Sequence, residues 1–148
     1  MTEPTKAHVL DGSSGDTFDL GVVRMRLLAT SKQTDGTFSL GEFSGAEGRW
    51  TVPHVHKKTH ESFFVLEGAF TFSLGSEDIE AKAGTYILVP LGLPHVITAH
   101  AGGGRFLTMW SPAGLEEMFV RLSQQSADGL RDPAVRAEMS RTFDSVPV

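Results

Sequence analysis

The sequence predicts an all-β protein, built as one sandwich or barrel of short strands and followed by a short helical segment. Its length of 148 residues suits a single domain with a buried core. Its 16 glycines and 7 prolines are spread between alternating apolar segments, which is typical of short strands joined by many turns. Apolar residues at helical spacing occur near the C-terminus, from Leu115 onward.

A polar arm precedes a succession of predicted strands. Residues 1–16 are polar and rich in glycine and serine, so we expect an N-terminal arm there. Residues 21–29 and 37–43 alternate in polarity, and the turn-forming SKQTDG between them predicts a hairpin. The barrel should occupy residues 17–112. Its further strands are expected at 51–56, 61–66, 69–74, 79–81, 86–89, 95–99 and 105–110.

The C-terminal segment, residues 113–148, should be helical and pack on the barrel. Asp132 is a suitable N-cap and Pro133 a suitable first residue for a helix that ends near Arg141. An earlier amphipathic helix is predicted by four apolar residues at helical spacing, which are Leu115, Met118, Phe119 and Leu122.

The composition excludes several classes of function. The chain has no cysteine, so a disulfide framework, a thiolate metal site and a cysteine nucleophile are all impossible. The formal net charge is -5 without a basic run, which disfavours nucleic acid and anionic membranes as partners. No apolar run is long enough to span a bilayer, and the N-terminus lacks the apolar core of a signal peptide. We therefore expect a cytoplasmic protein that binds a small molecule.

Three histidines and one glutamate form a candidate metal site. His54 and His56 are two positions apart on an extended segment, so their imidazoles project from the same face. Glu61 begins the next strand, which can pair antiparallel with the first and bring the carboxylate to that face, and His95 begins a later strand. Two histidines on a strand are commonly ordinary surface residues. Three imidazoles with a carboxylate, however, suit one divalent transition metal ion, namely Fe, Ni, Mn, Co, Zn or Cu.

The glycines and prolines around these residues carry a family resemblance. Gly48–Gly68, GRWTVPHVHKKTHESFFVLEG, resembles the first cupin motif, G-x5-H-x-H-x3,4-E-x6-G, at every position. Gly84–Ala99, GTYILVPLGLPHVITA, resembles the second motif, G-x5-P-x-G-x2-H-x3-N, except that Ala99 stands where the motif has Asn. The flanking stretches FSLGEF and SPAGLEEMF are similar to small bacterial cupins of the quercetin-dioxygenase-like group.

The resemblance implies a cupin double-stranded β-helix, or jelly-roll barrel, with one metal ion near one mouth. His60 adjoins Glu61 and should point away from this site if the strand has begun there, the alternative being that it is a ligand or contacts one. His8 and His100 are expected to be ordinary surface residues. The ligands that match their motif positions are His54, His56, Glu61 and His95.

Alternation along the strand of Glu61 predicts the residues of a substrate pocket. Phe63 and Val65 should face inward with Glu61. Other strands should contribute Ile97, one of the pair Tyr86 and Ile87, and one of the pair Thr108 and Met109. An apolar wall suits an aromatic ligand, although the same side chains could simply fill a small barrel. The predicted pocket consists of Phe63, Val65, Tyr86, Ile97 and Met109.

The resemblance implies a metal-dependent, dioxygenase-like oxidoreductase that acts on a small aromatic or enolic substrate. Glu61 would then be both a ligand and the catalytic proton acceptor. The alternatives are an isomerase or lyase, and a non-catalytic metallocupin that binds a small-molecule ligand, because the fold does not decide between them.

A homodimer is also expected from the resemblance. The same strand residues that could supply its interface could instead pack against the C-terminal helices. These residues are Val23, Met25, Leu27 and Phe64.

Overall fold

The computed structural model describes residues 5–148 and confirms an all-β fold with short C-terminal helices. The arm predicted at 1–16 lies partly outside the described residues, and its part from residue 5 to 16 forms no helix or strand. The strands are β1 (Thr17–Asp19), β2 (Val23–Ala29), β3 (Ser39–Gly45), β4 (Gly48–Arg49), β5 (His54–Val55), β6 (His60–Leu74), β7 (Glu77–Lys82), β8 (Tyr86–Val89), β9 (His95–Ser111) and β10 (Val146–Pro147). The helices are α1 (Ser31–Thr34), α2 (Leu115–Ser123), α3 (Ala127–Arg131) and α4 (Pro133–Thr142).

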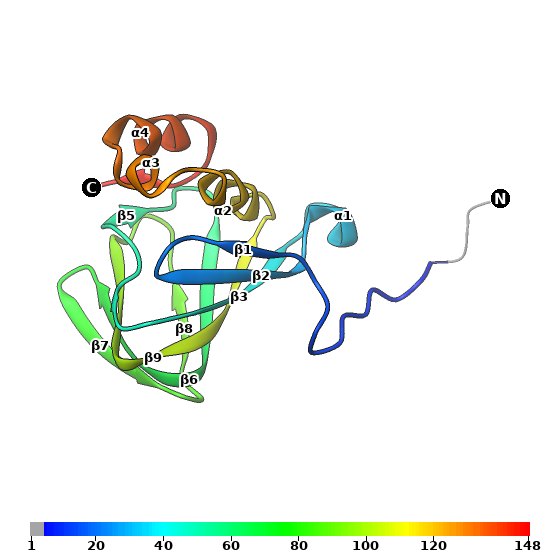
Figure 1. Ribbon diagram of the computed structural model, residues 1–148, viewed down its shortest axis with the longest axis horizontal. Helices are drawn as coiled ribbons and strands as arrows, with labels where there is room; N and C mark the ends of the chain where they lie inside the picture. Colours follow the sequence, from blue (N-terminus) through cyan, green and yellow to red (C-terminus); the bar gives the residue numbers. More distant parts are fainter. Residues whose placement is uncertain (1–4) are drawn as a thin grey trace.

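Two long strands hold the barrel together. The first half of β6 pairs with β8 and with the end of β9, whereas its second half pairs with β7 and with the beginning of β9. In turn, β9 pairs with β3 along its end and with β4 and β5 near its beginning. Both long strands therefore run through two sides of the barrel, as Figure 1 shows.

The sequence predicts two short strands where the structure has one long strand. The strands expected at 61–66 and 69–74 are both part of β6, and those expected at 95–99 and 105–110 are both part of β9. The glycines that suggested strand ends instead allow bulges, because the pairing of β6 with β9 shifts register between Val65 and Glu67 and again between Gly68 and Phe70. The AGGG segment is therefore a bend within β9.

Gly68 of β6 pairs with Gly104, the last residue of the AGGG segment, and tolerates no side chain. Its φ is +75°, and a Cβ atom there would lie 2.2 Å from the Gly103 carbonyl oxygen. We expect Gly68→Ala to lower the free energy of unfolding by more than about 2 kcal/mol, as measured by urea denaturation. Gly84→Ala is the matched control, because Gly84 has a φ of +92° but no atom within 4 Å of the added Cβ. Equal losses in the two variants would contradict the steric explanation.

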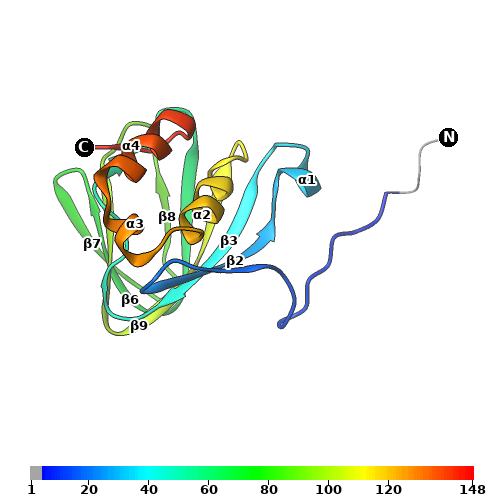
Figure 2. The ribbon, with the colours of Figure 1, turned by 45° about the horizontal axis from the view of Figure 1, so that its top comes forward.

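The C-terminal helices cover one end of the barrel (Figures 1 and 2). Leu115 and Met118 of α2 and Met139 of α4 are buried in the main hydrophobic core. The helix predicted to open at Pro133 is confirmed, with the Asp132 side chain accepting a hydrogen bond from the Ala134 amide. The chain then returns to the barrel, where β10 pairs antiparallel with β5.

Val23 and Met25 belong to this same core and are not available for an exposed dimer interface. Leu27 packs partly buried against the core, whereas Phe64 is exposed. The structure thus places Val23 and Met25 inside the protein, where the core packs, and not at a dimer interface. No helix in the range 5–148 has both the length and the apolar character needed to cross a membrane.

Candidate metal centre and its cavity

The fold brings the four predicted ligands to one point. His54 on β5 lies opposite His95 on β9, and the carboxylate of Glu61 reaches them from β6. One potential ligand atom from each of His54, His56, Glu61 and His95 lies within 4.8 Å of all the others. Each of these residues is less than a tenth exposed. His60 is exposed and lies outside the cluster, as expected for a side chain on the opposite face of the strand.

The three imidazoles share one hydrogen-bonding arrangement. The Nδ1 atoms of His54, His56 and His95 lie 2.6, 2.6 and 3.0 Å from the backbone carbonyl oxygens of Val52, Asp144 and Leu93, respectively. A proton on Nδ1 donates to each carbonyl, which leaves Nε2 to face the centre. Backbone carbonyls hold metal-binding histidines in this way in many proteins. The donor set therefore fits a divalent metal, and with one carboxylate the site would have a net charge of about +1.

Both oxygens of Glu61 have partners. Oε1 lies 3.1 Å from Nε2 of His56 and 3.0 Å from Nε2 of His95. Oε2 accepts a 2.5 Å hydrogen bond from the indole nitrogen of Trp110. Burial alone would raise the pKa of Glu61, but the hydrogen bonds and charges of His56 and His95 outweigh it and hold this pKa well below its usual range. Glu61 is therefore ionised, as a metal ligand must be.

The surroundings shift the pKa values of two of the histidines in opposite directions. Burial and then the charge of His95 lower the pKa of His54 to about 4, so this imidazole is neutral at pH 7. For His56, burial also lowers the pKa, but the hydrogen bond and charge of Glu61, with help from Asp144, outweigh it and raise the pKa above the usual value. Without a metal, a proton therefore occupies His56 more readily than His54.

Metal binding should consequently release a proton from His56. A histidine whose pKa is raised above the usual 6.5 is still more than half protonated at pH 6.5, and the metal needs its Nε2 lone pair. We expect the apparent affinity for Ni²⁺ to rise with pH between 6 and 8 and then level off. Calorimetry at pH 6.5 in two buffers of different ionisation enthalpy should give different binding heats. Identical heats would show that no proton leaves on binding.

Asp144 ties the C-terminal segment to the ligand-bearing turn. Its carboxylate accepts hydrogen bonds of 2.8 and 2.7 Å from the amides of Lys57 and Lys58, and its carbonyl accepts the Nδ1 proton of His56. These amide hydrogen bonds, with others from Thr59, outweigh the effect of burial and lower the pKa of Asp144. The amide of Val148 also donates to the carbonyl of Pro53. Residues after α4 therefore help to orient a candidate metal ligand.

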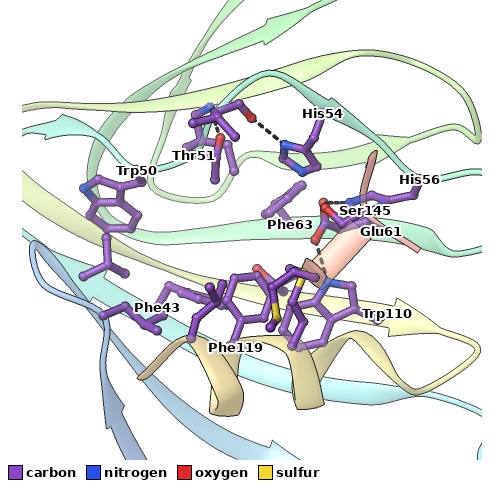
Figure 3. A pocket seen from close by; sticks show the side chains of 18 of the residues that line it. Phe43, Trp50, Thr51, His54, His56, Glu61, Phe63, Trp110, Phe119 and Ser145 are labelled. Carbon is purple, nitrogen blue, oxygen red and sulfur yellow. Dashed lines mark hydrogen bonds and ion pairs between the residues drawn. The ribbon is translucent and has the colours of Figure 1, made fainter. Parts of the chain in front are cut away.

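A cavity of about 170 Å³ opens beside the cluster, between the barrel and the C-terminal helices. In Figure 3, His54, His56 and Glu61 lie on one side of it and Trp50 on the other. The barrel contributes aromatic side chains including Phe43, Phe63 and Phe106, and residues of the C-terminal segment also line the cavity. The segment's contribution is Met118, Phe119, Leu122, Arg136, Met139, Ser145 and Pro147.

The predicted pocket residues separate into three groups. Phe63 and Ile97 line the cavity, and Val65 is fully buried but not among the lining residues. The predictions for Tyr86 and Met109 are wrong, because these side chains are 58% and 40% exposed on the outer face.

Strand register explains the error. Glu61 and Phe63 face inward and lie opposite Val89 and Ile87 on β8, and opposite Trp110 and Thr108 on β9. Tyr86 and Met109 have the other parity and must point outward. The inward members of the two open pairs are thus Ile87 and Thr108. The same alternation places Trp110 on the inward face, so this cavity residue could have been predicted once the register was known.

Comparisons with known proteins agree with this fold. Residues 42–110 match the family model described as a cupin domain. Over 114 residues, the chain is 30% identical to quercetin 2,3-dioxygenase of Bacillus subtilis; the alignment covers 77% of this chain and 34% of the relative. The chain thus spans about a third of the length of that curated relative.

Solved structures show the same fold at low sequence identity. One is KdgF from Halomonas, with a TM-score of 0.65, 17% identity, and coverage of 75% of this chain and 99% of that one. Another is Pac13 from Streptomyces, described as a nucleoside dehydratase, with a TM-score of 0.60, 17% identity, and coverage of 77% and 88%.

The barrel, the two motifs and the buried cluster define a small β-barrel protein with a site compatible with a metal. Residues 42–110 match the cupin domain, and the chain resembles small cupins of the quercetin-dioxygenase-like group.

Proposed function

We propose that this cupin is a metal-dependent oxidoreductase of the dioxygenase type, acting on a small aromatic or enolic substrate. The observation that carries the proposal is the opening of the His₃Glu cluster into a cavity walled by aromatic side chains. The relationship to a quercetin 2,3-dioxygenase supports the same class of reaction. A divalent metal held by His54, His56, Glu61 and His95 would supply a positive charge that binds and acidifies a substrate hydroxyl.

The chain's own residues would orient the substrate and exclude water. Phe63, Phe106 and Phe119 offer flat apolar surfaces for a ring, and the C-terminal helices cover the reacting end. Glu61 is proposed as the catalytic proton acceptor as well as a ligand. Oε1 is the atom that would take the proton, since Oε2 is held by Trp110. A carboxylate bound to a metal is a weak base, which favours substrates with acidic hydroxyls such as enols.

Oxygen consumption tests this proposal directly. Protein loaded separately with Fe²⁺, Mn²⁺, Co²⁺ or Ni²⁺ should consume oxygen with at least one substrate from a panel of flavonols, catechols and single-ring enols, and the Glu61→Gln variant should not. Absence of uptake with every metal and substrate would overturn the dioxygenase assignment. Conversion of substrate without oxygen would indicate an isomerase or lyase, and binding without conversion would indicate a ligand-binding protein.

We also propose that the protein is cytoplasmic and forms a homodimer. An apolar area on the outer face of β6, β8 and β9 supports the dimer, and it comprises Phe64, Tyr86, Leu88 and Met109. Light scattering would give the mass in solution, and a monomer at all concentrations would contradict the dimer.

A further inference from the structure

One permanently charged cation faces the cavity from the C-terminal helices. Among the described residues that line it, Arg136 is the only lysine or arginine. Arg136 precedes Met139 by three positions on α4, and residues at this spacing lie on the same side of a helix. Since Met139 is buried against the core and also lines the cavity, this face of α4 points toward the barrel.

The guanidinium of Arg136 has unused hydrogen-bonding capacity. Nη2 donates to the carbonyl of Leu130 at 3.2 Å. Within residues 5–148, no carboxylate lies within ion-pair distance of this guanidinium. A guanidinium has five N–H donors, arranged so that two of them can bind one carboxylate. An arginine that lines a mainly apolar cavity and makes no ion pair with the described residues is suited to an anionic ligand.

The size of the cavity limits what that ligand can be. Its volume of about 170 Å³ is close to the roughly 150 Å³ of an apolar protein cavity that accommodates benzene. A flavonol has two fused rings and a third attached ring, so it exceeds this space. One aromatic ring fits, with its substituents reaching toward the two ends of the cavity.

A second polar group of the wall lacks a partner. Thr108 is buried between Phe106 and Trp110 on the inward face of β9, and its hydroxyl makes no hydrogen bond to the part of the chain that the structure describes. Buried hydroxyls normally have partners. Rotation of this one side-chain torsion would turn the hydroxyl toward a ligand, so an oxygen substituent on the ring would give it a partner.

We propose that the cavity binds a hydroxylated single-ring aromatic carboxylate. The carboxylate pairs with Arg136, the ring packs against the cavity-lining Phe63 and Phe106, and a ring hydroxyl lies toward the His₃Glu cluster and Thr108. This proposal rests on the proposed function only in assigning a metal to the His₃Glu cluster that borders the cavity.

Binding of two matched compounds to the Ni²⁺-loaded protein tests the proposal without requiring turnover. 4-Hydroxybenzoate and 4-hydroxybenzamide share a ring and a hydroxyl, but only the first is an anion. Calorimetry should show at least about tenfold tighter binding of the acid, as expected for one charged hydrogen-bonded pair. In Arg136→Met the affinity for the acid should fall to that for the amide, while the amide's affinity is unchanged.

Arg141→Met is the control, since Arg141 lies on the same helix but does not line the cavity, and it should keep the preference for the acid. Arg136→Gln is a polar alternative in case the Arg136→Met variant does not fold. Equal affinity of the parent for acid and amide would overturn the proposal. A preference that survives both substitutions would also overturn it, because the carboxylate would then bind elsewhere.

The two proposals can fail separately. Arg136-dependent binding of the acid without oxygen consumption would leave the ligand class intact and remove the dioxygenase assignment. Oxygen consumption restricted to uncharged substrates, in the parent and in Arg136→Met alike, would keep the dioxygenase assignment and remove the proposed ligand class.

Discussion

Replacing Glu61 with glutamine is expected to weaken divalent metal binding by at least about 100-fold. The substitution preserves the shape of the side chain but removes the one negative charge among the four candidate ligands. The net charge of an occupied site would rise from about +1 to about +2 in a place almost closed to water, where charge is costly. A competition titration against a chromogenic chelator would measure the loss for Zn²⁺, Co²⁺ and Ni²⁺.

Glu67→Gln is the matched control for this experiment. Glu67 lies on the same strand, but its side chain is exposed and pairs with Arg105 on the surface. We expect this variant to bind metal as the parent does. Stoichiometric metal retained by Glu61→Gln after dialysis would mean that the carboxylate is not a ligand.

Replacing Trp110 with phenylalanine is expected to affect both stability and the metal centre. The variant keeps an aromatic ring next to Phe43 and Phe119 but removes the indole N–H that donates to Oε2 of Glu61. A buried hydrogen bond to a charged group contributes about 1.5–3 kcal/mol, so urea unfolding of the metal-free protein should show a loss of that size or slightly more. Freed from this contact, Glu61 should also bind metal about 10–100-fold more weakly.

Trp50→Phe separates this effect from the general cost of removing an indole. Trp50 also lines the cavity, but its indole donates to the backbone carbonyl of Ala46 at an exposed position. We expect a smaller loss of stability, below about 1.5 kcal/mol, and unchanged metal affinity. If the two tryptophan variants behaved alike in both measurements, the contact with Glu61 would have no special role.

The parts of the fold and site that the sequence predicts correctly are those that depend on local sequence patterns. Alternating polarity and regularly placed glycines indicated the barrel, and the spacing of His54, His56, Glu61 and His95 within two motifs indicated the cluster. Helix signals such as Asp132–Pro133 also have a local cause, because an N-cap and the proline after it act within one turn.

The errors arise where the outcome depends on register between distant strands. The inward or outward direction of Tyr86 and Met109 depends on which residues of β6 lie opposite them, and a shift by one position reverses every side chain. The contacts of Trp110 and Asp144 are equally non-local. The carbonyl of Asp144 that accepts from His56 lies 88 positions away in the sequence, and spacing alone gives no sign of such a contact.

The attachment of Asp144 to the ligand-bearing turn has a consequence for the order in which the protein matures. All four candidate ligands are synthesised before the carbonyl of Asp144 that holds His56. A nascent barrel can therefore form its strands before His56 is held in place. Metal should be captured tightly only after translation has passed Asp144 and β10 has docked beside His54.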